Sequence, residues 1–135
     1  MSELLPPYAA LMGIALHEDN GDGAPVLVAP FSDKLSGRPG HLHGGAIAGL
    51  LDMAAHAALV RSLEAEGRAR KFKPIGVTID YMRGGKERAT YARGRVIRIG
   101  ARVATVMVEA LQDESGGPPI AAQRLHVLLA REEGS

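Results

Sequence analysis

A carboxylate in the middle of an apolar segment is the feature of this sequence that most directly suggests chemistry. Asp52 interrupts residues 46–60, which are otherwise almost entirely apolar, and His56 follows one helical turn later. A helix that is apolar on all sides is typical of a protein interior, where an ionised carboxylate is costly unless it is paired. Asp52 therefore either pairs with His56 as a structural group or is held in this position for its reactivity.

A glycine-rich turn precedes this segment and predicts a helix start that stabilises anions. Gly44 and Gly45 follow His43 at the point where the helix must begin. The first N–H groups of a helix lack intrahelical acceptors and lie at the positive end of its dipole. Glycine lets a ligand approach such groups closely, so they can donate to the oxyanion of a tetrahedral intermediate. We expect burial to raise the pKa of Asp52, which makes it a better base, and His43 to shape the loop.

The histidines of this region also resemble a set of metal ligands. His41 and His43 alternate along the chain, and Asp52 or His56 would complete the set. Hydrolysis by a base and an oxyanion donor needs no metal, however, so we expect none here.

Length and composition predict one domain over residues 1–135, with a single core. The absence of cysteine excludes disulfides, thiolate chemistry and cysteine-based zinc sites. A net charge of +1 gives no global reason to expect nucleic-acid or membrane binding. The N-terminus lacks the features of a signal peptide, and residues 46–60 are too short to span a membrane. We therefore expect a cytoplasmic location.

The positive charge is concentrated in one part of the chain. Residues 61–102 contain twelve of the sixteen basic residues and only four acidic ones, a local excess of eight positive charges. This excess is consistent with a site for a phosphorylated ligand, and equally with solvated charges on strands.

Hydrophobic patterning predicts an α+β domain with one long helix and an antiparallel sheet. The expected elements are a short helix over 8–12, strands over 14–18 and 25–31 with a turn at 20–24, a helix over 44–66, and strands over 75–82, 88–99, 102–111 and 120–130. Short separators favour a meander of the last four strands. Apolar residues on both faces of strand 102–111, and Gly49 within the helix, indicate packing against a second subunit.

These motifs together resemble a known family. His43-Gly44-Gly45 followed by Asp52 is similar to the His-Gly-Gly…Asp signature of hotdog-fold acyl-CoA thioesterases of the phenylacetate-pathway type. The resemblance extends over residues 8–130, with weaker similarities at Thr78-Ile-Asp-Tyr-Met-Arg83, Arg98-Ile-Gly-Ala-Arg102, and Asp113-Glu-Ser-Gly with Ile120-Ala-Ala.

The resemblance implies a hotdog fold, in which a sheet wraps around one long helix, and assembly into homodimers or homotetramers. It places the active site between two subunits: the Gly44 or Gly45 N–H of one polarises the thioester carbonyl, and Asp52 of the other acts as base or nucleophile. It implies acyl-CoA or a related thioester as substrate, so CoA is part of the substrate and no separate cofactor is needed. The candidate substrate-binding residues are Arg83, Arg98, Arg102 and His56.

The sequence differs from the family pattern at three positions. Gly37 stands where an Asn is common, six residues before the His of the signature. The stretch around Pro74 replaces a Ser or Thr, and Gly84 replaces the Pro that usually follows the Arg.

Two other functions stay open at this stage. A hotdog dehydratase or hydratase would use His43 or His56 with Asp52, although the Gly-Asp-x-Asn-Pro motif typical of hydratases is absent. A non-catalytic acyl-CoA binding module would explain the missing polar groups at Gly37 and Pro74.

Overall fold

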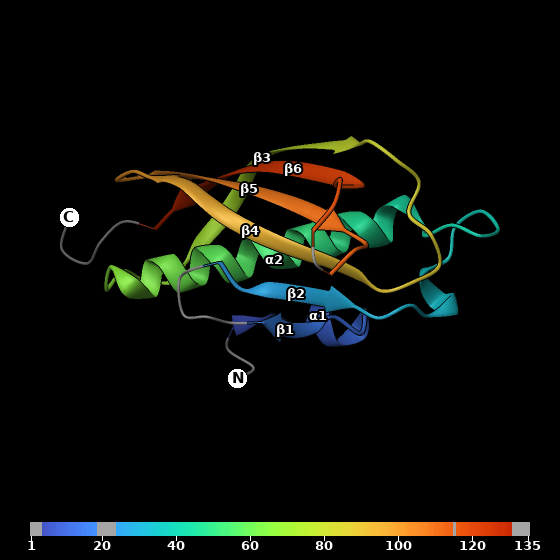
Figure 1. The fold of residues 1–135 in the computed structure, drawn as a ribbon. Coiled ribbons are helices and arrows are strands. Elements are labelled where there is room, and N and C mark those ends of the chain that lie inside the picture. Colours follow the sequence, from blue (N-terminus) through green and yellow to red (C-terminus); the bar gives the residue numbers. More distant parts are fainter. Residues whose placement is uncertain (1–3, 19–23, 115, 131–135) are drawn as a thin grey trace.

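One antiparallel sheet curves over one long helix (Figure 1) in the computed structural model, which describes residues 4–18, 24–114 and 116–130. The elements are α1 (Pro7–Leu11), β1 (Ala15–Glu18), β2 (Val26–Ala29), a 3-10 turn (Asp33–Leu35), α2 (Gly44–Ala65), β3 (Phe72–Tyr81), β4 (Thr90–Ile99), β5 (Val103–Leu111) and β6 (Ala121–Leu129). The sheet order is β1-β2-β4-β5-β6-β3, with antiparallel neighbours throughout. The expected α+β architecture is confirmed, while residues 20–23 of the expected turn lie outside the described residues.

The long helix begins and ends close to the residues expected. The His43 side chain caps its first turn by accepting a hydrogen bond from the Gly45 N–H. At the other end Gly67 adopts a φ of 67°, and the Arg68 N–H donates to the Leu63 carbonyl at 2.9 Å. A glycine in the left-handed region is a common helix terminator because it lacks a Cβ.

Small residues allow α2 to lie very close to β4. A Cβ added at Gly94 would lie 2.7 Å from the Ala54 carbonyl oxygen and 3.0 Å from the Ala58 Cβ. The helix backbone therefore rests directly on the strand, and large side chains fill the core on either side of this contact. The largest fully buried ones on α2 are Leu50, Leu51, Leu59 and Leu63.

Gly49 packs within its own chain, which corrects the expectation that it contacts a partner helix. A Cβ at Gly49 would lie 2.9 Å from the Tyr8 hydroxyl and 3.5 Å from the Met12 Cε. The segment that includes α1 therefore covers this side of α2.

Of the last four strands, β4, β5 and β6 form the expected meander, but β3 does not lie beside β4. β3 pairs with β6 at the far edge of the sheet, and β4 pairs with β2 and β5. The connection between β3 and β4 is a crossing segment that is tied to other loops: the Leu42 N–H donates to the Gly85 carbonyl at 2.9 Å, and the Gln112 side chain bonds both backbone groups of Lys86 at 2.9 Å. A short connection favours adjacent strands, but this connection is held by hydrogen bonds to other loops. The prediction that β3 lies beside β4 was therefore wrong.

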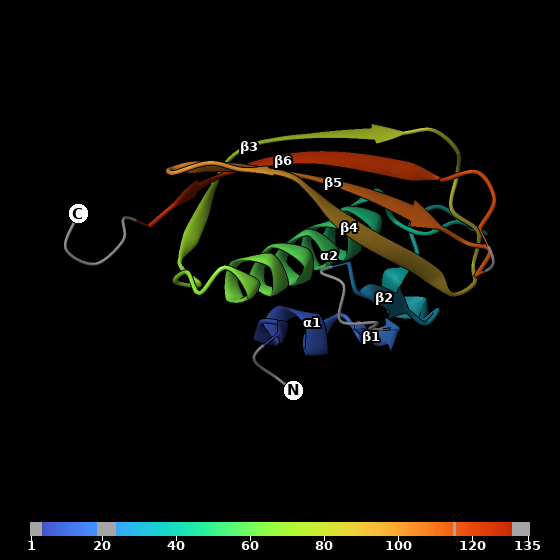
Figure 2. The same ribbon diagram turned by 60° about the vertical axis from the view of Figure 1, so that its left-hand side comes forward.

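β3 also starts earlier than the expected residue 75. The strand begins at Phe72 and includes Pro74, with a bulge between Pro74 and Gly76. Proline is tolerated in an edge strand, because on the unpaired side no neighbouring strand needs the N–H that proline lacks. Figure 2 shows β3 at the edge of the sheet opposite β1 and β2.

One face of the molecule is left uncovered beside β3. Between residues 49 and 60 of α2 only Asp52 is exposed and only His56 is half-buried, so the expectation of a helix buried on all sides is wrong along this stripe. On β3, Val77 is 56% exposed and Tyr81 53% exposed. α2 is long and apolar enough to cross a membrane by length alone, but about two thirds of its most apolar window (67%) is buried in the domain, which identifies it as the core helix.

Candidate functional site

The start of α2 is held by hydrogen bonds that leave one N–H without an acceptor. The Gly45 N–H donates to Nδ1 of His43 at 2.8 Å, and the Tyr81 hydroxyl donates to the Gly44 carbonyl at 3.0 Å. The His43 carbonyl accepts from the N–H groups of the first helical turn. Within the described residues, the Gly44 N–H meets no acceptor. Of the two glycines expected to bind an oxyanion, Gly44 is therefore the one with an available donor.

The Gly44 N–H lies beside a shallow cleft of about 300 Å³, which also contains residues not singled out from the sequence. The Nδ1 of His41 lies 3.1 Å from the Pro39 carbonyl oxygen. A carbonyl only accepts, so Nδ1 carries the hydrogen and the neutral ring presents an unprotonated Nε2. Arg83 is fixed by its Nε, which donates to the Pro119 carbonyl at 3.1 Å. The cleft is lined by Arg38, His41, Leu42, Gly44, Ile47, Tyr81, Met82, Arg83, Gly84 and Gly85.

Asp52 lines a second cleft, of about 420 Å³, further along α2. Asp52 is solvent-exposed on one side, but its partial burial in this cleft still raises its pKa above the ordinary 3.8, and the nearby His56 offsets part of that shift. Burial likewise lowers the pKa of His56, against the effect of Asp52 and together with that of Arg70. Among the described residues no hydrogen bond or ion pair joins Asp52 to His56, whose ring instead lies against Phe72 with centroids 5.3 Å apart. Pro74 forms part of the same cleft.

The oxyanion donor and the carboxylate cannot meet within one chain. Gly44 and Asp52 are eight residues apart on a continuous α-helix, which separates them by about 12 Å along its axis. A thioester carbon within reach of one is therefore out of reach of the other. Both clefts nevertheless open on the side of α2 that this chain leaves uncovered, where Ala48 lies between them and is only half-buried.

The three candidate arginines are also divided between the two ends of α2. Arg83 lies in the cleft at Gly44, whereas Arg98 and Arg102 flank the hairpin between β4 and β5. That hairpin is tied to the C-terminal end of α2, because Arg68 donates to the Gly100 and Ala101 carbonyls at 2.9 and 3.0 Å. One chain alone therefore does not gather the three arginines around one ligand.

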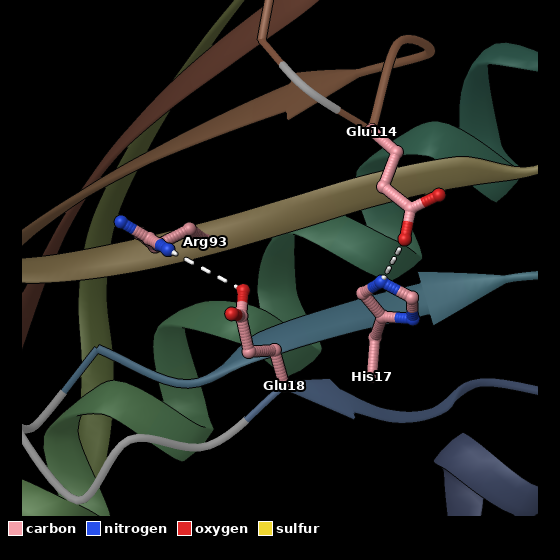
Figure 3. Close-up of polar contacts among 4 residues, drawn as sticks. All are labelled: His17, Glu18, Arg93 and Glu114. Carbon is pink, nitrogen blue, oxygen red and sulfur yellow. Dashed lines mark hydrogen bonds and ion pairs between the residues drawn. The ribbon is translucent and has the colours of Figure 1, made fainter.

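A further hollow of about 720 Å³ contains none of the expected site residues. It lies on the side of β4 turned away from α2, between β1 and the loop after β5. Two pairs of its polar groups interact: His17 Nε2 lies 2.8 Å from a Glu114 carboxylate oxygen, and Arg93 lies 3.9 Å from Glu18 (Figure 3). Size alone does not make it the reactive site, because it offers neither a free helix N–H nor a desolvated carboxylate.

Metal ligation finds no support in the described ranges, 4–18, 24–114 and 116–130: no three His, Asp or Glu side chains gather there. Sequence reasoning missed Tyr81 and Arg38, and considered His41 only as a metal ligand. Tyr81 comes to the helix start from the end of β3, and Arg38 and His41 come from the loop before α2. Their spacing in the sequence does not predict that they meet there.

The chain is similar to known proteins both in sequence and in fold. The sequence model of the thioesterase superfamily matches residues 39–118. A solved protein from Chromobacterium violaceum is 32% identical, with a TM-score of 0.70, over 92% of this chain and 83% of that one. Among curated proteins no sequence matches.

Two further solved structures share the fold at lower identity. A thioesterase from Haemophilus influenzae is 15% identical with a TM-score of 0.79, over 95% of this chain and 87% of that one. A phenylacetic acid degradation protein from Thermus thermophilus, solved as a mutant, is 21% identical with a TM-score of 0.72, over 93% of this chain and 100% of that one. These likenesses confirm the expected hotdog fold.

Proposed function

This chain belongs to the thioesterase superfamily, as its His-Gly-Gly…Asp signature indicated, and we propose that it hydrolyses an acyl-CoA thioester to a free acid and CoA. Family membership supports thioester hydrolysis in general. The observation that carries the more specific proposal is the Gly44 N–H, which has no acceptor in the described structure and lies in a cleft on the same open face as Asp52. An oxyanion donor and a carboxylate with a raised pKa are the two groups that this reaction uses in the proposed mechanism.

The proposed site is shared by two copies of the chain. Because Gly44 and Asp52 are about 12 Å apart along α2, two helices in antiparallel contact would bring Gly44 of each copy opposite Asp52 of the other. The uncovered stripe of α2 and the exposed apolar residues of β3 supply a surface for that contact. We therefore propose a homodimer as the smallest active unit, two of which can associate into a homotetramer.

In the proposed mechanism the Gly44 N–H of one copy donates to the thioester carbonyl oxygen. Asp52 of the second copy takes a proton from a water molecule, whose oxygen attacks the carbonyl carbon. The negative charge that develops on the carbonyl oxygen is stabilised by the Gly44 N–H and the helix dipole. The C–S bond then breaks, the CoA sulfur takes the proton from Asp52, and the acid is released. A raised Asp52 pKa favours the first proton transfer, the removal of a proton from water, since the carboxylate is then more basic.

CoA is favoured as the thiol because basic side chains lie at both ends of α2. In the antiparallel dimer, Arg83 of one copy and the Arg98–Arg102 hairpin of the other would lie at the same end of the paired helices. Arginine binds phosphate through charge-assisted, often bidentate hydrogen bonds. His56, beside Asp52, would contact the acyl group or the attacking water. The reaction uses no cofactor, and we place the protein in the cytoplasm, where acyl-CoA is available.

One panel assay tests the proposal against its alternatives. Purified protein would be supplied with acyl-CoA thioesters of different chain length and type, and free thiol, hydration of enoyl-CoA, and binding by calorimetry would be measured. Release of thiol at a saturable rate supports the proposal. Hydration of enoyl-CoA without thiol release would establish the dehydratase or hydratase function instead. Binding with neither reaction would establish a binding module and overturn the proposal.

A further inference from the structure

The peptide unit between Gly44 and Gly45 is held at both ends by side chains from outside α2. Its carbonyl oxygen accepts from the Tyr81 hydroxyl at 3.0 Å, and its N–H donates to His43 Nδ1 at 2.8 Å. Tyr81 is the last residue of β3, and His43 is the cap residue of α2. A strand end, the first helical turn and the cap are therefore joined by two hydrogen bonds that share one peptide plane.

The two bonds form a directed chain. A hydroxyl that donates to a carbonyl oxygen polarises the peptide and strengthens its N–H as a donor, so the first bond reinforces the second. Because a backbone N–H only donates, His43 Nδ1 must accept, and the hydrogen of the neutral ring lies on Nε2. Tyr81 thereby stabilises one tautomer of His43 although the two residues share no hydrogen bond in the described structure.

The same arrangement fixes the direction of the Gly44 N–H. That group belongs to the preceding peptide, whose carbonyl, on His43, accepts from Ala46 at 2.9 Å and from Ile47 at 3.2 Å. With the peptides on both sides held, Gly44 loses the backbone freedom that a glycine otherwise has. The Tyr81 ring lies against Gly44 as well, since a Cβ added there would be 3.7 Å from three of its atoms.

We propose that Tyr81 is a positioning residue for thioester hydrolysis: its hydroxyl holds the Gly44–Gly45 peptide so that the Gly44 N–H points at the developing oxyanion and His43 keeps its Nε2–H tautomer. This inference rests on the proposed function for its consequence in turnover. Donors that are already aimed at an oxyanion stabilise it without reorganisation during the reaction, which is why a group that only positions them affects the rate.

The kinetic test compares Tyr81→Phe with Tyr91→Phe. Tyr91 lies on β4 and meets the His17 ring edge-on in the hollow of about 720 Å³, on the side of β4 turned away from α2, so it serves as the matched control. For Tyr81→Phe we expect kcat to fall by about threefold to tenfold, the scale of one hydrogen bond, with KM changed less than twofold. The fall should be equal for acyl-CoA and for a short thioester without the nucleotide. A kcat within twofold of the wild type, or a rise in KM alone, would overturn the proposal.

A spectroscopic test separates failure of this proposal from failure of the proposed function. NMR of the ¹⁵N-labelled protein should show His43 as the Nε2–H tautomer, and Tyr81→Phe should shift the Gly45 amide proton upfield while Tyr91→Phe leaves it unchanged. This readout needs no substrate, so it holds even if no thioester is hydrolysed. An Nδ1–H tautomer in the wild type, or an unchanged Gly45 amide in Tyr81→Phe, would refute the positioning role.

Discussion

Two inactive variants should restore activity when they share a dimer. Gly44→Ala places a methyl group where the substrate carbonyl must approach, and the chain tolerates it, because the nearest existing atoms are 3.7 Å away. Asp52→Asn removes the base and should lower kcat by about 10²-fold or more. In a mixed dimer, one site combines the intact Gly44 of one subunit with the intact Asp52 of the other. The second site combines both substitutions.

The expected recovery follows from this geometry. Equal co-expression gives mixed dimers as about half of all dimers, and each has one intact site of two. The mixture should therefore show about a quarter of the wild-type kcat per subunit, far above either parent. The assay is thiol release from an acyl-CoA after co-purification through two different affinity tags, which isolates the mixed dimers and should double the value to about one half.

A matched control and a clear contrary result complete the experiment. Co-expression of Asp52→Asn with the double variant, Gly44→Ala plus Asp52→Asn, leaves no intact site in any dimer and should stay at the parental level. If the first mixture also stays at the average of its parents, both groups act within one chain, and the reasoning from the separation along α2 is refuted.

Three further results are expected. Partial burial raises the pKa of Asp52, so just above pH 3.8 the folded state binds more protons than the unfolded state, and the free energy of unfolding falls as pH rises through that window. Urea unfolding should therefore show Asp52→Asn gaining stability relative to the wild type between about pH 4 and pH 7. An equal difference in stability at both pH values would contradict this. Gly94→Ala should lower stability by about 1–3 kcal/mol and the melting temperature by roughly 4–10 °C, because the added Cβ meets helix backbone. Gly76→Ala, with its nearest contact at 3.8 Å, should be tolerated, and equal melting temperatures for the two variants would refute the close packing. Arg83→Ala should raise KM for acyl-CoA severalfold with little change in kcat, and an equal loss on a short thioester would show that Arg83 acts through its bond to a loop carbonyl instead.

The sequence was sufficient to predict the helix and the fold class, for identifiable reasons. A long apolar run after a glycine turn predicts a core helix, and α2 begins at the expected residue. Strand order was not predictable in the same way. β3 pairs with β6 because the segment after β3 is bonded to Leu42 and Gln112, residues distant in sequence from it. Local spacing contains no information about such contacts.

The candidate site was predicted in part, and its missing half depends on tertiary contacts. The glycine turn and Asp52 were recognised because their residue types are unusual in an apolar segment. Which glycine offers its N–H could not be predicted, because that depends on the His43 ring accepting from Gly45. In the sequence Tyr81 is only one residue of an expected strand, and the role of its hydroxyl is visible only once β3 lies beside the start of α2.

The departures from the family pattern at Gly37 and Gly84 are structurally coupled and are not independent losses. A Cβ at Gly37 would lie 2.9 Å from the His43 Cα, so an Asn there would displace the residue that caps α2. A Cβ at Gly84 would lie 2.8 Å from the His41 Cδ2, so a proline would displace the imidazole. The two glycines together let the loop before α2 fold against the segment after β3, which brings His41 and Arg38 into the cleft at Gly44. The loop before α2, which has Gly37 where the family pattern has an Asn, therefore places an imidazole and a guanidinium in this cleft.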